Sequence, residues 1–158
     1  MRESEQTDHV PAASNASASE HAARNLAWHG AAVFLGAMLY GGVISAIMTD
    51  RLPGRVDVAL SAHMNGLLGG LWCWGAGWSL QYGKFSPRAL AAITWGTIIP
   101  SWANFVITAF KVHTDAGGVG FDGGPASDAI FAGRLLFVVA PGLIGGLALV
   151  MGLKRTAG

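Results

Sequence analysis

The sequence predicts an all-α integral membrane protein folded as a four-helix bundle. Three observations lead to this class. Apolar residues make up 52% of the 158 residues and charged residues only 12%, about half the charged share of a soluble protein. Glycine occurs 23 times, a content that favours close contact between membrane helices. The apolar residues are concentrated in four long stretches separated by polar segments.

Each apolar stretch contains about 22 residues, which as a helix would be about 33 Å long and would cross the hydrocarbon core of a bilayer. We therefore predict membrane spans at about residues 27–48, 59–80, 89–110 and 130–153, within one transmembrane domain of residues 26–155. The preceding leader, residues 1–25, is polar and rich in Ser and Ala, and its small apolar content predicts disorder. The first stretch begins too late and is too long to be a cleavable signal peptide.

The basic residues near the span ends predict the orientation. One side has a small excess of Lys and Arg, contributed by Arg24, Lys84, Arg88, Lys154 and Arg155; the other has Arg51, Arg55 and Lys111. Positive residues favour the cytoplasmic side, so we predict both termini in the cytoplasm, a bacterial-type inner membrane and lipid as the surroundings. The net charge of +1 and the absence of a basic cluster argue against nucleic acid as a partner.

Polar side chains in the third stretch follow one helical face. They step by three or four residues through Thr94, Thr97, Ser101, Asn104, Thr108 and Lys111. Polar groups turn inward in a membrane bundle, so this face is predicted to line the interior. The hydroxyls could instead bond carbonyls of their own helix. The amide of Asn104 has more donors and acceptors than its own helix can satisfy.

The second stretch carries a matching face of small residues around one histidine. Its members are Ala59, His63, Gly66, Gly70, Cys73 and Gly77. A small face admits either another helix or a flat ligand. His63 could be a packing residue bonded to Asn104 or to a carbonyl. It could also be the axial ligand of a haem, whose porphyrin would lie against Gly66 and Gly70.

The other histidines do not offer an obvious second iron ligand. His29 and His113 lie near span ends, so the haem interpretation predicts a five-coordinate iron with one face open for chemistry. Arg134 enters the fourth stretch about one turn after its start. It could snorkel to the headgroups or pair with a haem propionate.

Three segments resemble one known family. The patterns WHGAAVFLGAMLYG, SAHMNGLLGGLW and WANF resemble the small four-helix membrane family of styrene oxide isomerase and hydroxylaminobenzene mutase, over about Trp28 to Lys154. The resemblance implies a homotrimer with haem b, His63 as the iron ligand, and Trp102 and Asn104 beside it. The chain departs from the family pattern at Gly69, Pro100 and Thr108, where the family carries an amide, an acidic residue and a tyrosine; these departures put styrene oxide itself in doubt as the substrate.

We therefore expect an isomerase acting on a small apolar aromatic substrate, with ferric haem as a Lewis acid on the substrate oxygen. The reaction would convert an epoxide to an aldehyde or, alternatively, a hydroxylaminoarene to an aminophenol. The expected catalytic residues are Asn104, Trp102 and Thr108, and the expected cofactor residues are His63, Gly66, Gly70 and Arg134. Two functions of other classes stay open: a non-catalytic haem or electron-transfer module, and a small transporter subunit.

Overall fold

The computed structural model describes residues 12–114, 116–117, 120–121 and 124–154. Helix α1 comprises Ala12–Met48, α2 comprises Val56–Ser79, and the 3-10 helix η1, Leu80–Tyr82, follows α2 directly. Helix α3 comprises Pro87–Lys111. The last helix runs from Pro125 to Lys154 as three segments: α4, Pro125–Arg134; the π-helical segment η2, Leu135–Val139; and α5, Ala140–Lys154. The described part of the chain contains no strand, so the all-α prediction is confirmed.

Three of the helices are long and apolar enough to cross a membrane: Ala16–Met48, Pro87–Lys111 and Pro125–Lys154. Helix α2 has sufficient length at 24 residues, but His63, Asn65 and Asp57 make it less apolar. Many large apolar side chains on the outer surface are exposed, including Leu39 at 71% and Phe110 at 69%. Such a surface suits a lipid environment, because a soluble monomer rarely exposes large contiguous apolar patches. The prediction that α2 also spans the membrane stays a prediction.

The first helix begins earlier than the sequence predicted. Residues 12–25, for which the composition predicts disorder, are helical and continuous with the first apolar stretch. Alanine is the strongest helix former, and this segment is rich in it. Ala22 is also buried in a core cluster with residues of α2 and α3. Tertiary contact therefore stabilises a segment whose polarity alone argued against order; residues 1–11 lie outside the described part of the chain.

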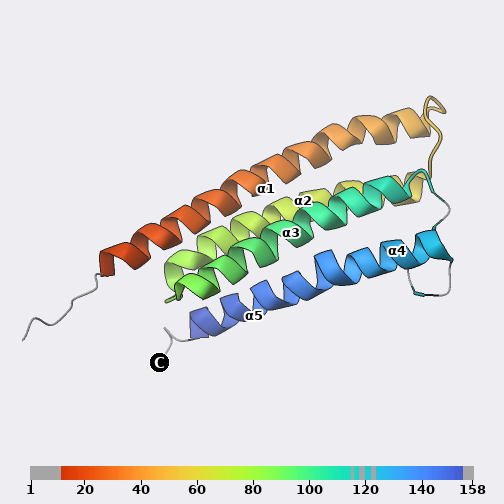
Figure 1. The fold of residues 1–158 in the computed structure, drawn as a ribbon. Helices are drawn as coiled ribbons and strands as arrows, with labels where there is room; N and C mark the ends of the chain where they lie inside the picture. Colours follow the sequence, from red (N-terminus) through yellow and green to blue (C-terminus); the bar gives the residue numbers. More distant parts are fainter. Residues whose placement is uncertain (1–11, 115, 118–119, 122–123, 155–158) are drawn as a thin grey trace, which may run out of the picture.

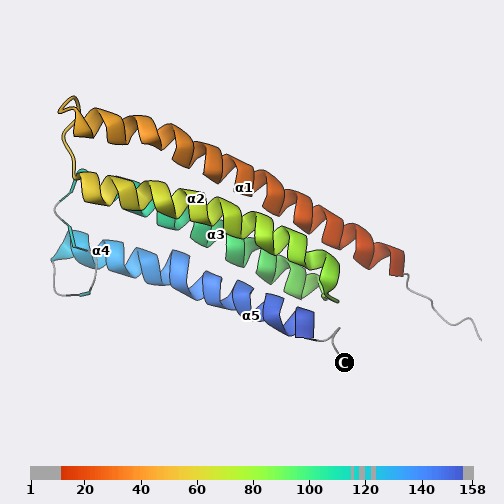
Figure 2. The same cartoon turned by 180° about the vertical axis from the view of Figure 1, so that it is seen from behind.

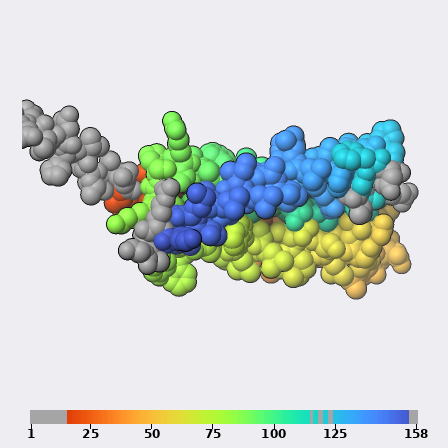
Figure 3. Space-filling view, turned by 90° about the horizontal axis from the view of Figure 1, so that it is seen from below, coloured from red at the N-terminus to blue at the C-terminus, as the bar shows by residue number. Residues whose placement is uncertain are grey.

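The helices form layers around α2 and α3. Helix α1 lies along α2 and α3 on one side, while α4 and α5 lie along the opposite side (Figures 1 and 2). Figure 3 looks onto the face covered by α4 and α5, with α3 on one flank of this helix and α2 on the other. Helix α1 begins at the end of the bundle where α5 ends (Figure 1). This arrangement agrees with an even number of passes between the two termini.

Glycine contacts bring the layers close together. A Cβ atom on Gly70 of α2 would lie 2.8 Å from the carbonyl oxygen of Gly30 in α1. A Cβ atom on Gly96 of α3 would lie 2.6 Å from the carbonyl oxygen of Pro141 and 2.7 Å from the Cα atom of Gly145. These backbones touch without intervening side chains, as small residues allow in membrane bundles.

The π-helical segment precedes Pro141 in the last helix. The backbone N–H of Ala140 bonds the carbonyl of Leu135, five residues earlier. Proline has no N–H and its ring clashes with the carbonyl four residues before it, so an α-helix must adjust at this position. A single π turn makes that adjustment while the helix continues to Lys154.

Candidate functional site

His63 lies at the contact between α1 and α2 and is half-buried. Its Nδ1 atom is 2.7 Å from the carbonyl oxygen of Ala37 in α1. A carbonyl only accepts hydrogen bonds, so the neutral imidazole must carry its proton on Nδ1. The lone pair then resides on Nε2. A carbonyl that fixes one imidazole nitrogen and leaves the other as an electron-pair donor is the usual arrangement around a metal-ligating histidine.

The glycines expected to receive a porphyrin are instead covered by other helices of the same chain. A Cβ atom on Gly66 would lie 2.6 Å from the Cβ of Ala37 and 3.0 Å from Cδ2 of Phe105. Gly70 lies against Gly30 and Phe34 of α1. The expectation that Gly66 and Gly70 form an open cradle is therefore corrected: within one chain, their small size serves helix packing.

The polar face of α3 points into the bundle, as the spacing predicted. Thr94, Thr97, Ser101 and Thr108 are buried, and Asn104 and Lys111 are half-buried. The hydroxyl of Ser101 lies 2.8 Å from the carbonyl of Thr97 on its own helix and 3.2 Å from that of Gly69 on α2. It also accepts a hydrogen bond from the thiol of Cys73 at 3.5 Å. Ser101 thus bonds a carbonyl of its own helix and also contacts α2, so both interpretations of the polar face hold at this residue.

Thr108 is a junction between three helices. Its side chain is only 3% exposed, and its hydroxyl oxygen accepts a hydrogen bond from Nδ2 of Asn65 in α2 at 3.0 Å. The same oxygen accepts a second bond from Nη2 of Arg134 in α4 at 3.3 Å. These contacts make Thr108 a positioning residue for Asn65 and Arg134, and its burial keeps substrate away from it within one chain.

Arg134 points toward the neighbouring helix α3, and the interpretation that it snorkels to the headgroups stays a prediction. Its side chain is half-buried and bonded to Thr108 of the neighbouring helix. Its Nε atom is buried and has no hydrogen-bond partner among the described residues. This guanidinium is therefore an interior positive group with donor capacity left over.

Trp102 lies against α1, on the other side of α3 from α4. Its indole N–H donates to Nδ1 of His29 at 3.3 Å. An indole nitrogen is only a donor, so the neutral His29 carries its proton on Nε2. His29 and His63 thus have opposite tautomers, and of these two histidines His63 is the one with a free imidazole lone pair on Nε2.

The structure does not bring all the predicted site residues together within one chain. Trp102 contacts His29, and no described contact connects Trp102 or Asn104 to His63. Asn104 lies one turn before Thr108, and its amide makes no hydrogen bond to the described residues. On α2, His63 contacts α1 whereas Asn65 contacts α3. Residues that are two positions apart on a helix point in directions about 200° apart, so the side chains of His63 and Asn65 lie on opposite flanks of α2.

Three residues of this region were not anticipated as site components. Asn65 does not belong to the small face of α2, yet it bonds Thr108. Phe105 occupies the space beside Gly66 and makes an edge contact with Tyr40. His29 lies near the end of a predicted span and partners Trp102. Phe105 could have been found from its position four residues after Ser101 on the buried face of α3; the others required knowledge of helix neighbours.

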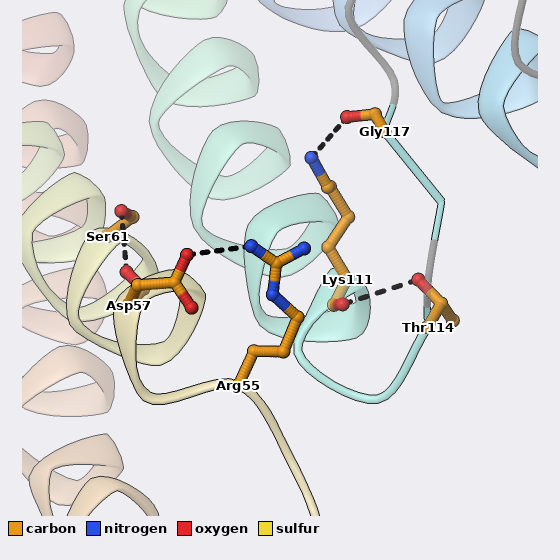
Figure 4. A network of polar contacts seen from close by, with 6 residues as sticks. All are labelled: Arg55, Asp57, Ser61, Lys111, Thr114 and Gly117. Atoms are coloured by element: carbon orange, nitrogen blue, oxygen red, sulfur yellow. Dashed lines mark hydrogen bonds and ion pairs between the residues drawn. The ribbon is translucent and has the colours of Figure 1, made fainter.

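A polar network closes the end of the bundle where α1 meets α2 and α3 meets α4 (Figure 4). Arg55 and Asp57 form an ion pair at 2.8 Å. Asp57 precedes the span predicted from about residue 59, and the hydrogen bond from Arg55 lowers the pKa of its carboxyl. The ammonium of Lys111 donates to the carbonyl of Gly117, so this cation anchors the chain that follows α3.

Two cavities of about 440 and 460 Å³ lie at the other end of the bundle, beside η1. The first is lined mainly by apolar side chains, including Trp74 and Trp78, and the second includes Lys84 and Phe85. Neither contains a predicted site residue. The candidate site therefore has two parts. His63 lies on the flank of α2 that faces α1, and Asn65, Thr108 and Arg134 lie together on the flank that faces α3.

Comparison with known protein families matches residues 22–156 to the family described as Styrene oxide isomerase. No curated protein and no solved structure matches the chain. The matched segment includes every candidate site residue and extends from the early part of α1 to just beyond α5.

Proposed function

The chain belongs to the styrene oxide isomerase family, and we propose that it is a membrane isomerase that converts a small aromatic epoxide to an aldehyde with haem b bound through His63. The observation that carries the cofactor proposal is the hydrogen bond between Nδ1 of His63 and the carbonyl of Ala37. It sets the tautomer that an iron ligand requires and orients the ring.

The donor set of the chain fits a haem better than a bare metal ion. The described residues contain no cluster of three or more His, Cys, Asp or Glu side chains that could hold a metal. His63 can supply one nitrogen ligand, and a porphyrin supplies its own four. His63 would be the one imidazole that holds the haem on this flank, which suits a haem that would supply Lewis acidity, whereas electron-transfer haems commonly use two protein ligands.

The cofactor proposal implies a homo-oligomer. Gly66 and Gly70 are covered by α1, so a haem at His63 would lie on the outer part of the α1–α2 flank. This flank exposes Leu60 and Leu71, which would enclose a porphyrin only together with another surface. We propose that a second copy supplies that surface; a trimer is the number that the family resemblance implies.

A ring of copies would also bring His63 and Asn104 of neighbouring chains close to each other. His63 and Asn65 lie on opposite flanks of α2, and Asn104 lies one turn from Thr108, the partner of Asn65. Rotational assembly places one flank of each copy against the opposite flank of the next. The His63 flank of one copy would then face the Asn104 flank of its neighbour.

Haem would supply Lewis acidity toward the epoxide oxygen. The amide N–H of Asn104 would donate a hydrogen bond to that oxygen and stabilise the negative charge that develops as the C–O bond breaks. Trp102 lies two residues before Asn104 and contacts His29 of α1, so it would pack α3 against α1 and hold Asn104 in position from the opposite face of α3. The rearrangement consumes no external electron and needs no covalent attachment to the protein.

Replacing His63 tests the proposal. We expect His63→Ala to lose haem or to show altered ligation in the optical spectrum of detergent-purified protein, with isomerisation of whichever aromatic epoxide the unmodified protein converts falling in proportion to haem content. Added imidazole should partly restore the spectrum. His113→Ala is a matched control, because Nδ1 of His113 is also bonded to a carbonyl, that of Pro53 at 2.9 Å, but the side chain is exposed at the bundle end.

Three outcomes would contradict the proposal in different ways. An unchanged haem spectrum and normal turnover in His63→Ala would make His63 a packing residue. A low-spin six-coordinate spectrum in the unmodified protein would favour an electron-transfer module. Purified protein without any pigment would favour a transporter or a structural subunit.

A further inference from the structure

Arg134 has hydrogen-bond donors that the described protein does not use. It is the last residue of α4, directly before the π-helical segment. Nη2 donates to Thr108 at 3.3 Å, whereas the buried Nε has no partner in the described part of the chain. A guanidinium presents its donors as a planar fork that matches two oxygens of one anionic group. The Nε donor of this fork is buried and is left unpaired by the described residues.

The described residues provide no negative group to balance this charge. The ion pair found among them joins Arg55 to Asp57. Asp128 lies six residues before Arg134, about 9 Å away along the helix axis, and its Oδ1 is itself buried without a partner. Lys111, three residues after Thr108 on α3, is a second cation. An interior cation without a counter-charge is costly, so a negative ligand would stabilise this arrangement.

The orientation of Arg134 is held by a chain of hydrogen bonds. Asn65 donates to the hydroxyl oxygen of Thr108, and the same oxygen accepts from Arg134. Three helices thus contribute to the position of one guanidinium before any ligand arrives. A preorganised donor loses less conformational entropy when it binds than a free side chain does.

We propose that Arg134, positioned by Thr108 and Asn65, binds an anionic oxygen ligand, either a carboxylate or a phosphate ester. The two chemistries share the bidentate geometry and differ in source. A carboxylate would be a propionate of the porphyrin, and this version rests on the proposed function. A phosphate ester would come from a membrane phospholipid and is independent of the haem.

The experiment compares Arg134→Gln with the unmodified protein in two measurements. Apo-protein is titrated with haem and with haem dimethyl ester, in which both propionates are neutral. In parallel, native mass spectrometry counts bound phospholipid after purification with added phosphatidylglycerol. Arg88→Gln is the control, because Arg88 is an exposed arginine in the first turn of α3.

A propionate site predicts that the unmodified protein binds haem about 10- to 100-fold more tightly than the ester, as expected for a charged hydrogen bond. Arg134→Gln should bind both equally, and Arg88→Gln should behave like the unmodified protein. A phosphate site predicts equal binding of haem and ester but loss of bound phospholipid in Arg134→Gln. If the unmodified protein binds no haem, the cofactor proposal fails. The phospholipid measurement alone then decides whether Arg134 binds an anion.

Two results would overturn the anion site. The first is that Arg134→Gln changes neither the preference for haem over its ester nor the retained phospholipid. The second concerns Asp115 and Asp122, which lie outside the described residues. If Asp115→Asn with Asp122→Asn lowers the thermal unfolding midpoint as much as Arg134→Gln does, and combining all three adds nothing, then a carboxylate of the chain itself is the partner of Arg134.

Discussion

The substitution Gly66→Ala tests whether the small face of α2 packs against another helix or contacts a flat ligand. The new Cβ would lie 2.6 Å from the Cβ of Ala37 and 3.0 Å from Cδ2 of Phe105, whereas carbon atoms in contact normally lie about 3.5–4.0 Å apart. The methyl of Ala37 has no rotamer with which to move away, so α1 and α2 must separate by about 1 Å. Overpacking of this kind costs about 1–3 kcal/mol, and the better helix propensity of alanine offsets about 1 kcal/mol.

We therefore expect Gly66→Ala to lower the free energy of unfolding by up to about 2 kcal/mol, and the midpoint of thermal unfolding by up to about 8 °C for a chain of this size. Tryptophan fluorescence of the detergent-solubilised protein measures this change. Gly75→Ala on the same helix is the control, because a Cβ on Gly75 meets nothing within 4 Å; it should be neutral or slightly stabilising.

A double-mutant cycle with Ala37→Gly identifies the contact. Removing the methyl of Ala37 opens the space that the new methyl of Gly66→Ala needs, so the pair should be more stable than the sum of the single changes predicts. The contact with Phe105 remains, so the rescue is partial. Additivity within about 0.5 kcal/mol would refute direct packing. Normal stability with a selective loss of haem affinity would show instead that Gly66 faces a ligand.

The remaining predictions concern the other helix contact, the topology and the assembly. Gly96→Ala should destabilise the protein by about 1–3 kcal/mol, because its new Cβ would meet the backbone of Pro141 and Gly145, whereas Gly146→Ala, with nothing within 4 Å, should not; equal unfolding midpoints for the two variants would contradict the α3–α5 contact. Reporter fusions at the C-terminus and at Gly120 should report opposite sides of the membrane, and a shared side would remove one span. Native mass spectrometry should detect a haem-bearing homo-oligomer, most simply a trimer, and a haem-loaded monomer would contradict a site between copies.

The sequence by itself determined the helices and their inward faces. The steps of three and four residues through Thr94, Thr97, Ser101 and Thr108 predicted a buried face of α3, and those side chains are buried. The spacing of Ala59, Gly66, Gly70 and Cys73 did the same for α2. Both inferences depend on the local geometry of one helix, in which sequence separation sets direction. The family, too, was recognisable from the segments around Trp28, His63 and Trp102.

Only the tertiary structure decided what each inward face touches. Periodicity gives the direction of a side chain around its own helix but not which neighbouring helix lies there, and in a membrane protein the apolar exterior gives little further guidance. Packing placed α1 and Phe105 against Gly66, and joined both Asn65 and Arg134 to Thr108. Contacts distant in sequence also stabilised residues 12–25 as a helix, although the polarity of this segment had predicted disorder.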